Sequence, residues 1–173
     1  VPLRIYWCKL ARQASKLSSR GKAKITLTLA KKHKSRKIIV WCGTIKHCME
    51  TAAVWTKVFP EWLIAVDTSK KSSEYARYDD FVATQDKALL FCAAKHREGS
   101  DIPGLSMGVF VDGVAKRGAA VFVQCAGRVL RRACQGYTKD VGVILDLHAD
   151  NGLELCDRLG EYLRLPTGLI PWE

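Results

Sequence analysis

Short apolar runs recur along this chain and are separated by longer, more polar segments. The runs cover residues 37–42, 63–66, 88–92, 108–111 and 141–147. Short and nearly continuous apolar runs are typical of strands that are buried on both faces of a sheet. Because the segments between them are long enough for helices, the pattern predicts an α/β fold, with a mostly parallel sheet of about five strands and helices on both faces.

The segments before and directly after the first run differ in how clearly they indicate helices. Residues 3–18 place apolar side chains at loosely helical spacing, and residues 22–33 fit both a strand and a helix. A helix is expected over about 45–59, because Thr44 suits an N-cap and Pro60 stops a helix.

The later segments predict two more helices. Ser72 or Ser73 is expected to cap a helix that ends near Thr84. A closing helix is expected over 152–164, and the tail at 167–173, which contains Gly and Pro, is expected on the surface.

Positive charge is concentrated at the start of the chain. Residues 1–60 hold 14 Lys and Arg against one acid, whereas residues 61–173 hold 14 against 16, within a formal net charge of +11. This asymmetry favours a polyanionic partner, with nucleic acid ahead of an acidic protein. Candidate contacts are Lys31, Lys32 and Lys34, which form a basic turn. The alternatives are a solvated basic helix face and a face docked on an acidic lobe.

The seven cysteines indicate reduced thiols. Their number is odd and no C-x-x-C occurs, which favours an intracellular protein of the nucleus or cytoplasm over a secreted one. No apolar run approaches the ~20 residues of a membrane span, so no membrane association is expected. Asp146, His148 and Asp150 alternate and allow a metal nuclease as a distant alternative, but no metal site is predicted.

The strongest chemical motif is VFVQCAGRVLRR at 121–132, which has the pattern Q-x-x-G-R-x-x-R. If the segment is helical, Gln124, Arg128 and Arg131 share one face, and Gly127 permits a tight turn or a close approach. Two guanidiniums and an amide on one face suit a polyphosphate, because Arg offers planar donors that are always charged. The alternative is a solvated basic helix.

A second motif, KHREGSDIP at 95–103, directly follows an apolar run. Gly99 allows its loop to approach a ligand closely, and Asp101 can accept a hydrogen bond from a ribose hydroxyl or orient an arginine. In the alternative reading, Glu98 and Asp101 only cap the loop.

Together the two motifs resemble motifs V and VI of superfamily 2 helicases of the DEAD/DEAH type, in their C-terminal RecA-like lobe. The resemblance extends over about 37–146, where KIIVWCGT resembles motif IV, and is closest to the branch of phage, large-virus and restriction-enzyme motors. It favours a helix over 22–33. It also implies a division into a basic, helical inter-lobe segment at 1–36 and a RecA-like domain at 37–173.

The resemblance implies a role for each motif residue. Arg128 and Arg131 are expected to act as catalytic arginine fingers, and Gln124 to contact the γ-phosphate, the attacking water or the other lobe. The residues implied in nucleotide binding are Gly99, Asp101 and Gly127. The residues expected to bind nucleic acid are Thr44, Lys95, Arg97, Lys31, Lys32 and Lys34. Ala93 and Ala94 depart from the family, which often has Thr and a polar residue there.

Two motifs of an ATPase do not occur in the sequence. There is no G-x-x-x-x-G-K-[ST] loop, and Asp79-Asp80 lies in a helical pattern and not at the end of a strand. The resemblance therefore implies half of an ATP-dependent helicase site, in which a first RecA-like lobe in cis binds most of the ATP and Mg²⁺. DNA is favoured over RNA as the partner. The alternative is a non-catalytic module that binds nucleic acid or docks on a lobe.

Overall fold

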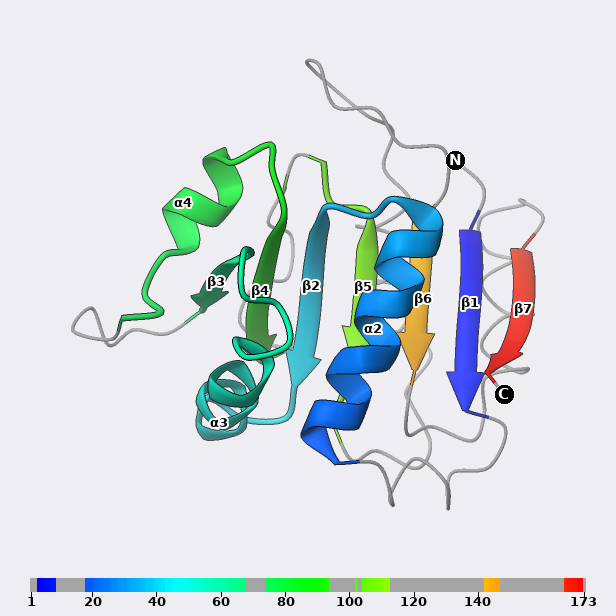
Figure 1. The fold of residues 1–173 in the computed structure, drawn as a ribbon, viewed down its shortest axis with the longest axis horizontal. Coiled ribbons are helices and arrows are strands. Elements are labelled where there is room, and N and C mark those ends of the chain that lie inside the picture. Colours follow the sequence, from blue (N-terminus) through cyan, green and yellow to red (C-terminus); the bar gives the residue numbers. More distant parts are fainter. Residues whose placement is uncertain are drawn as a thin grey trace.

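The computed structural model describes residues 3–8, 18–67, 74–93, 102, 104–112, 142–146 and 167–172. Within them, seven strands form one sheet in the order β3-β4-β2-β5-β6-β1-β7, and every pairing is parallel (Figure 1). The strands are β1 (Leu3–Cys8), β2 (Lys37–Cys42), β3 (Leu63–Val66), β4 (Ala88–Ala93), β5 (Met107–Phe110), β6 (Gly142–Asp146) and β7 (Thr167–Trp172).

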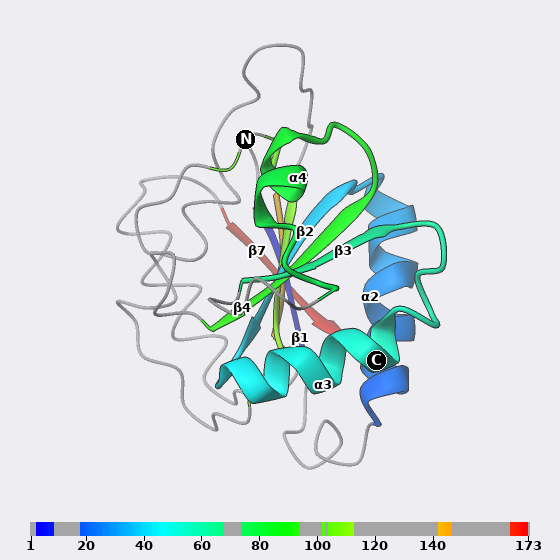
Figure 2. The same ribbon diagram turned by 90° about the vertical axis from the view of Figure 1, so that its left-hand side faces the viewer.

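Three described helices accompany the sheet: α2 (Ser19–His33), α3 (Ile45–Trp55) and α4 (Tyr78–Ala83). Helices α2 and α3 contact each other and lie on the same side of the sheet (Figure 2). Helix α4 packs on the opposite side. Lys37 and Ile38 are successive residues of β2, so their side chains point to opposite faces of the sheet, and the Lys37 ammonium donates to the Val82 carbonyl of α4 at 3.1 Å. Helices thus cover both faces, as the sequence predicts.

Strand β2 is buried on both faces because each of its six side chains is buried. Ile38 and Val40 join the core beneath α2 and α3, which includes Ala23 and Trp55. Trp41 points to the other face, where its indole stacks on Phe110 with ring centroids 4.5 Å apart. Such two-sided burial explains the continuous apolar run of the sequence.

The five predicted strands are all present, with ends shifted by at most one residue, and two further strands extend the sheet. Residues 3–8 are strand β1 and not part of a helix, because β1 pairs with both β6 and β7. Within the range 1–36, the described residues form β1, which joins the sheet, and α2; the helix expected over 22–33 is present as part of α2. The tail that is expected on the surface includes β7, which is the outermost strand of the sheet next to β1.

Two helices are shorter than expected. Helix α3 ends at Trp55, whose carbonyl accepts both the Val58 and the Phe59 N–H at 2.9 Å in a tight turn. Helix α4 begins at Tyr78 without a side-chain cap. The Tyr75 carbonyl accepts instead from the Val66 N–H at the end of β3, which keeps this part of the chain out of the helix. Ser72 and Ser73 lie outside the described residues.

Candidate functional site at the carboxyl edge of the sheet

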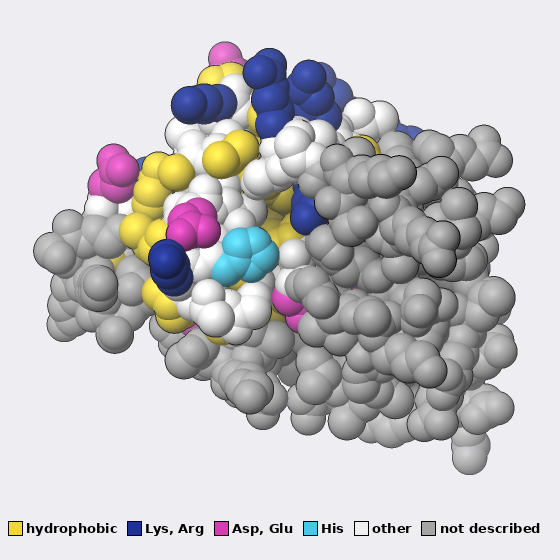
Figure 3. Space-filling view, turned by 90° about the horizontal axis from the view of Figure 1, so that it is seen from below, with side chains coloured by type: hydrophobic (Ala, Val, Ile, Leu, Met, Phe, Trp, Pro, Cys, Tyr) yellow, Lys and Arg dark blue, Asp and Glu magenta, His cyan; other side chains and the backbone are white. Residues whose placement is uncertain are grey.

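The edge at which the parallel strands end is called the carboxyl edge here, and it lies at the bottom of Figure 1. Gly43 and Thr44 follow β2 there, Asp67 follows β3, and Asp112 follows β5 by two residues. Seen from this side, several Lys and Arg side chains lie along the top of the described surface, and a histidine lies nearer its middle with an acidic and a basic side chain beside it (Figure 3). Ligands of open parallel sheets bind at such an edge.

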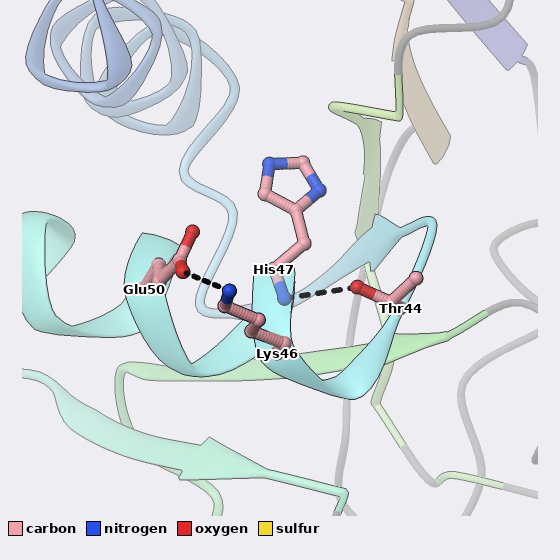
Figure 4. A network of polar contacts seen from close by, with 4 residues as sticks. All are labelled: Thr44, Lys46, His47 and Glu50. Atoms are coloured by element: carbon pink, nitrogen blue, oxygen red, sulfur yellow. Dashed lines mark hydrogen bonds and ion pairs between the residues drawn. The ribbon is translucent and has the colours of Figure 1, made fainter.

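Thr44 is the N-cap of α3, as the sequence predicts. Its backbone is extended, and its hydroxyl oxygen accepts from the His47 N–H at 3.1 Å (Figure 4). An exposed Lys46–Glu50 ion pair of 4.0 Å links the first and second turns of α3, and the His47 imidazole points away from it. The cap therefore uses one acceptor site of the Thr44 hydroxyl, whose proton remains suited to donate to a phosphate oxygen.

The loops after β2 and β5 lie next to each other. A methyl group placed on Gly43 would lie 4.0 Å from the Asp112 Cβ, which is an ordinary contact distance. Asp112 was not singled out from the sequence, although its place just after an apolar run is a signal that points to this edge. This pair brings a small residue and a carboxylate together beside the start of α3.

The thiols at this edge are buried in the core. Cys42, at the end of β2, forms a side-chain hydrogen bond with Cys48 of α3. This hydrogen bond, burial and the proximity of Cys48, Cys92 and Asp112 all raise the pKa of the Cys42 thiol. Among the described residues, Cys42, Cys48 and Cys92 have free thiols. A thiol held protonated in this way is a poor nucleophile.

Lys31, Lys32 and Lys34 do not lie at the carboxyl edge. They end α2 immediately before β2 begins, whereas Thr44 follows the end of β2. A six-residue strand spans roughly 20 Å, so the two groups of predicted nucleic-acid contacts are about that far apart. Any single ligand that touches both must extend across one side of the sheet.

The residues of the two strongest motifs lie outside the described residues. They are Lys95, Arg97, Gly99, Asp101, Gln124, Gly127, Arg128 and Arg131. Their predicted roles therefore stay predictions. Ala93, which precedes the first of these motifs, is the buried last residue of β4 and so lies at the carboxyl edge.

Asp146, the last residue of β6, is buried, whereas His148 and Asp150 lie outside the described part of the chain. Among the described residues, no group of three His, Cys, Asp or Glu side chains is placed to hold a metal ion. None of the described helices is both long enough and apolar enough to cross a membrane.

Comparisons with known proteins agree with this geometry at the level of the fold. No protein-family model matches the sequence, and no curated protein matches it. Among solved structures, domain 2 of the DEAD-box helicase Mss116p, bound to an RNA duplex, is similar with a TM-score of 0.64 at 15% identity, over 100% of this chain and 64% of that chain.

Two further structures are similar. The C-terminal domain of the DEAD-box protein Dbp5 has a TM-score of 0.63 at 18% identity and covers 99% of this chain and 90% of its own. A fragment of an HsdR subunit of a type I restriction enzyme from Vibrio vulnificus YJ016 has a TM-score of 0.73 at 18% identity, over 98% of this chain and 36% of its own.

The fold is therefore a RecA-like α/β fold of the kind found in helicase domains. More particularly, the chain has the fold that domain 2 of Mss116p, the C-terminal domain of Dbp5 and the HsdR fragment share. It spans 64% of the Mss116p chain and 36% of the HsdR chain, and so corresponds to one part of those proteins.

Proposed function

We propose that this chain is the second motor lobe of an ATP-dependent nucleic-acid helicase or translocase. One combined observation carries this proposal. The all-parallel sheet has the fold of a helicase second domain, and the same chain contains both the Q-x-x-G-R-x-x-R and the KHREGSDIP motifs. A fold alone does not define an activity. The motif residues are what make the motor a better proposal than an unrelated use of the fold.

The donor set suits a nucleoside triphosphate. Arg128 and Arg131 provide two permanent positive charges and Gln124 an amide, while Gly99 and Gly127 provide positions where a backbone can approach a ligand closely. The sequence contains no phosphate-binding loop, so a first lobe in the same protein holds most of the ATP and its Mg²⁺. When bound, ATP supplies the phosphoryl bond whose hydrolysis moves the lobes.

Arg128 and Arg131 act as arginine fingers in this proposal. Their guanidiniums reach across the closed interface between the lobes and neutralise the charge that develops on the phosphoryl oxygens. Gln124 contacts the γ-phosphate, the attacking water or the other lobe. Asp101 accepts a hydrogen bond from the ribose or holds one of the arginines in place.

Nucleic acid is the proposed partner at the carboxyl edge. Thr44 lies at the start of α3, where backbone N–H groups and a hydroxyl suit a phosphate oxygen. Lys95 and Arg97 follow β4 in the sequence and supply positive charge in place of the hydroxyl that Ala93 lacks. The preference for DNA over RNA rests on the sequence resemblance to restriction-enzyme motors. An intracellular site of action, in the nucleus or cytoplasm, follows from the reduced cysteines and the nucleic-acid partner.

ATP turnover by the complete two-lobe protein tests this function. Arg128→Ala and Arg131→Ala should each lower turnover by ~10³-fold or more, the scale of an arginine finger. Lys87→Ala, at an exposed lysine away from the carboxyl edge, is the control and should turn over ATP at the parental rate. The 173-residue chain by itself should show no turnover, since it lacks the loop lysine.

The strongest competing function is a non-catalytic module that binds nucleic acid, which the charge asymmetry also favours. Such a module has no use for two arginines at finger spacing. Full turnover in the Arg128→Ala protein, together with a loss of nucleic-acid affinity, would establish the module and refute the motor.

A further inference from the structure

Three cations of α2 form a line on its exposed side. Arg20, Lys24 and Lys31 are exposed and fall within about 40° of arc on a helix of 3.6 residues per turn. The line is roughly 16 Å long at 1.5 Å per residue. Among the described residues, none of the three has an acidic partner within 4.0 Å, because the described ion pairs are Lys46–Glu50 and Arg77–Asp80.

Helix stability does not explain this line. The first turn of α2 contains no acid, and Arg20 lies in it, where the positive end of the helix dipole disfavours a cation. Arg20 and Lys24 are also like charges at i and i+4, which repel each other. By contrast, the basic residues of the last turn, Lys31 among them, are favoured by the dipole. The charge at the start of the helix therefore requires another reason.

The exposed surface of α2 contains no apolar anchor. Every exposed position from 19 to 33 is Arg, Lys or Thr, while Ile25 and Leu27 are partly buried against the core. Protein partners usually bind through buried aromatic or aliphatic anchors. A surface of cations and hydroxyls alone is typical of contacts to a phosphate backbone.

The line extends between the carboxyl edge of the sheet, where the strands end, and the opposite edge, where they begin. Helix α2 starts beside the end of α3, where the Trp55 indole N–H donates to the Ser19 hydroxyl at 3.2 Å, and it ends just before β2 begins (Figure 1). It therefore runs from near the carboxyl edge, up the side of the sheet that α2 covers, toward Lys34 and Arg36, which are also exposed.

We propose that the exposed side of α2 is a track for the sugar–phosphate backbone of nucleic acid, with Arg20 and Lys24 as contacts in addition to Lys31. Phosphates of one strand follow each other every ~3.4 Å along the duplex axis and farther apart along the backbone itself, so a track of this length passes several of them. Its contacts are sequence-independent, and they hold nucleic acid that extends beyond the carboxyl edge. The inference rests on nucleic acid as the partner in the proposed function.

The test compares two double variants of the 173-residue chain that remove the same charge. Lys24→Gln/Lys31→Gln changes the track, whereas Arg77→Gln/Lys87→Gln changes exposed cations outside α2, directly before α4 and directly before β4. Binding to a labelled DNA duplex of about 20 base pairs is followed by fluorescence anisotropy between about 50 and 200 mM salt. An RNA duplex of the same sequence forms a second arm, and thermal unfolding confirms that each variant is folded.

The track variant should lose about tenfold in affinity, and its log–log salt slope should fall by about 2, close to one counterion per lost contact. The control variant should match the parent. If the parent binds the duplex and the two variants show equal salt slopes, the track is refuted and the proposed function is unaffected. If the parent shows no salt-dependent binding to either duplex, both nucleic acid as the partner in the proposed function and the track are refuted. Displacement of the duplex by poly-glutamate at equal charge concentration would assign the surface to an acidic protein.

Discussion

Gly108 of β5 lies directly against the indole of Trp41 on the neighbouring strand. A methyl group at Gly108 would collide with the Trp41 ring and would also come within 3.2 Å of Ile144 Cδ1. Both strands are buried here, so the ring has little room to move. Gly108→Ala should therefore lower the free energy of unfolding by about 1–3 kcal/mol, as overpacking of a core does.

Gly43→Ala is the matched control, because among the described residues a methyl group there comes near Asp112 Cβ alone, at 4.0 Å. Urea unfolding of the two variants should show a loss for Gly108→Ala and almost none for Gly43→Ala. Equal stabilities would show that β5 and Trp41 are not packed as described.

The buried Lys37 predicts a dependence of stability on pH. Burial lowers its pKa from 10.5 to about 8. Between these values the folded chain binds fewer protons than the unfolded chain, so the free energy of unfolding should rise as the pH rises through this window. The rise from this one group is of the order of 1–3 kcal/mol.

Lys37→Met should flatten this rise, since methionine fills similar space without a charge. Lys24→Met, at an exposed position, is the control and should keep the parental pH profile. Urea titrations across the window measure both. A Lys37→Met profile as steep as the parent's would assign the rise to other groups.

Thr44 allows its two proposed roles, capping and phosphate binding, to be separated. Thr44→Ala removes the acceptor of the His47 N–H and should cost about 1 kcal/mol of stability. Thr44→Asp keeps a good N-cap but places a negative charge at the start of α3. The Asp variant should therefore be as stable as the parent and bind nucleic acid more weakly, as thermal unfolding and anisotropy can measure. An Asp variant with parental affinity would leave Thr44 with capping alone.

The two strongest motifs should divide their labour in the complete protein. Lys95→Ala and Arg97→Ala should weaken nucleic-acid binding and stimulated ATP turnover by about tenfold while the basal rate is retained, because their proposed contacts are phosphates of the strand. Arg128→Ala and Arg131→Ala should lower both rates and leave the affinity for nucleic acid nearly unchanged. Parallel assays of basal turnover, stimulated turnover and binding separate the two classes, and identical profiles would refute the division.

Local sequence patterns were sufficient for the strands of the sheet centre. Strands β2 and β4 are short continuous apolar runs because both of their faces are buried. Their burial can therefore be predicted from their own residues, without knowledge of the neighbouring strands. The same holds for the Thr44 cap, which needs only one side chain and the N–H three residues later.

Strands β1 and β7 could not be predicted in the same way. Arg4 interrupts the apolar run of β1, and what makes β1 a strand is its pairing with β6 and β7, which lie far away in the sequence. Pro171 and Gly168 in β7 argue against a strand, yet a proline is tolerated there because β7 lies at the edge of the sheet. In the candidate site, the line of cations on α2 became visible only when the exposed side of the helix was known.

The place of β1 between β6 and β7 affects how this chain is made. Trp7 is aligned with Asp146 on one side and with Pro171 on the other, so β1 leaves the ribosome long before either of its neighbours. The centre of the sheet can form during synthesis, but β1 has to wait until residues 142–172 have been made, and closing so long a loop is slow. Synthesis that stops before residue 142 leaves β1 with neither neighbour, so incorporation of β1 is a late step in the folding of this sheet.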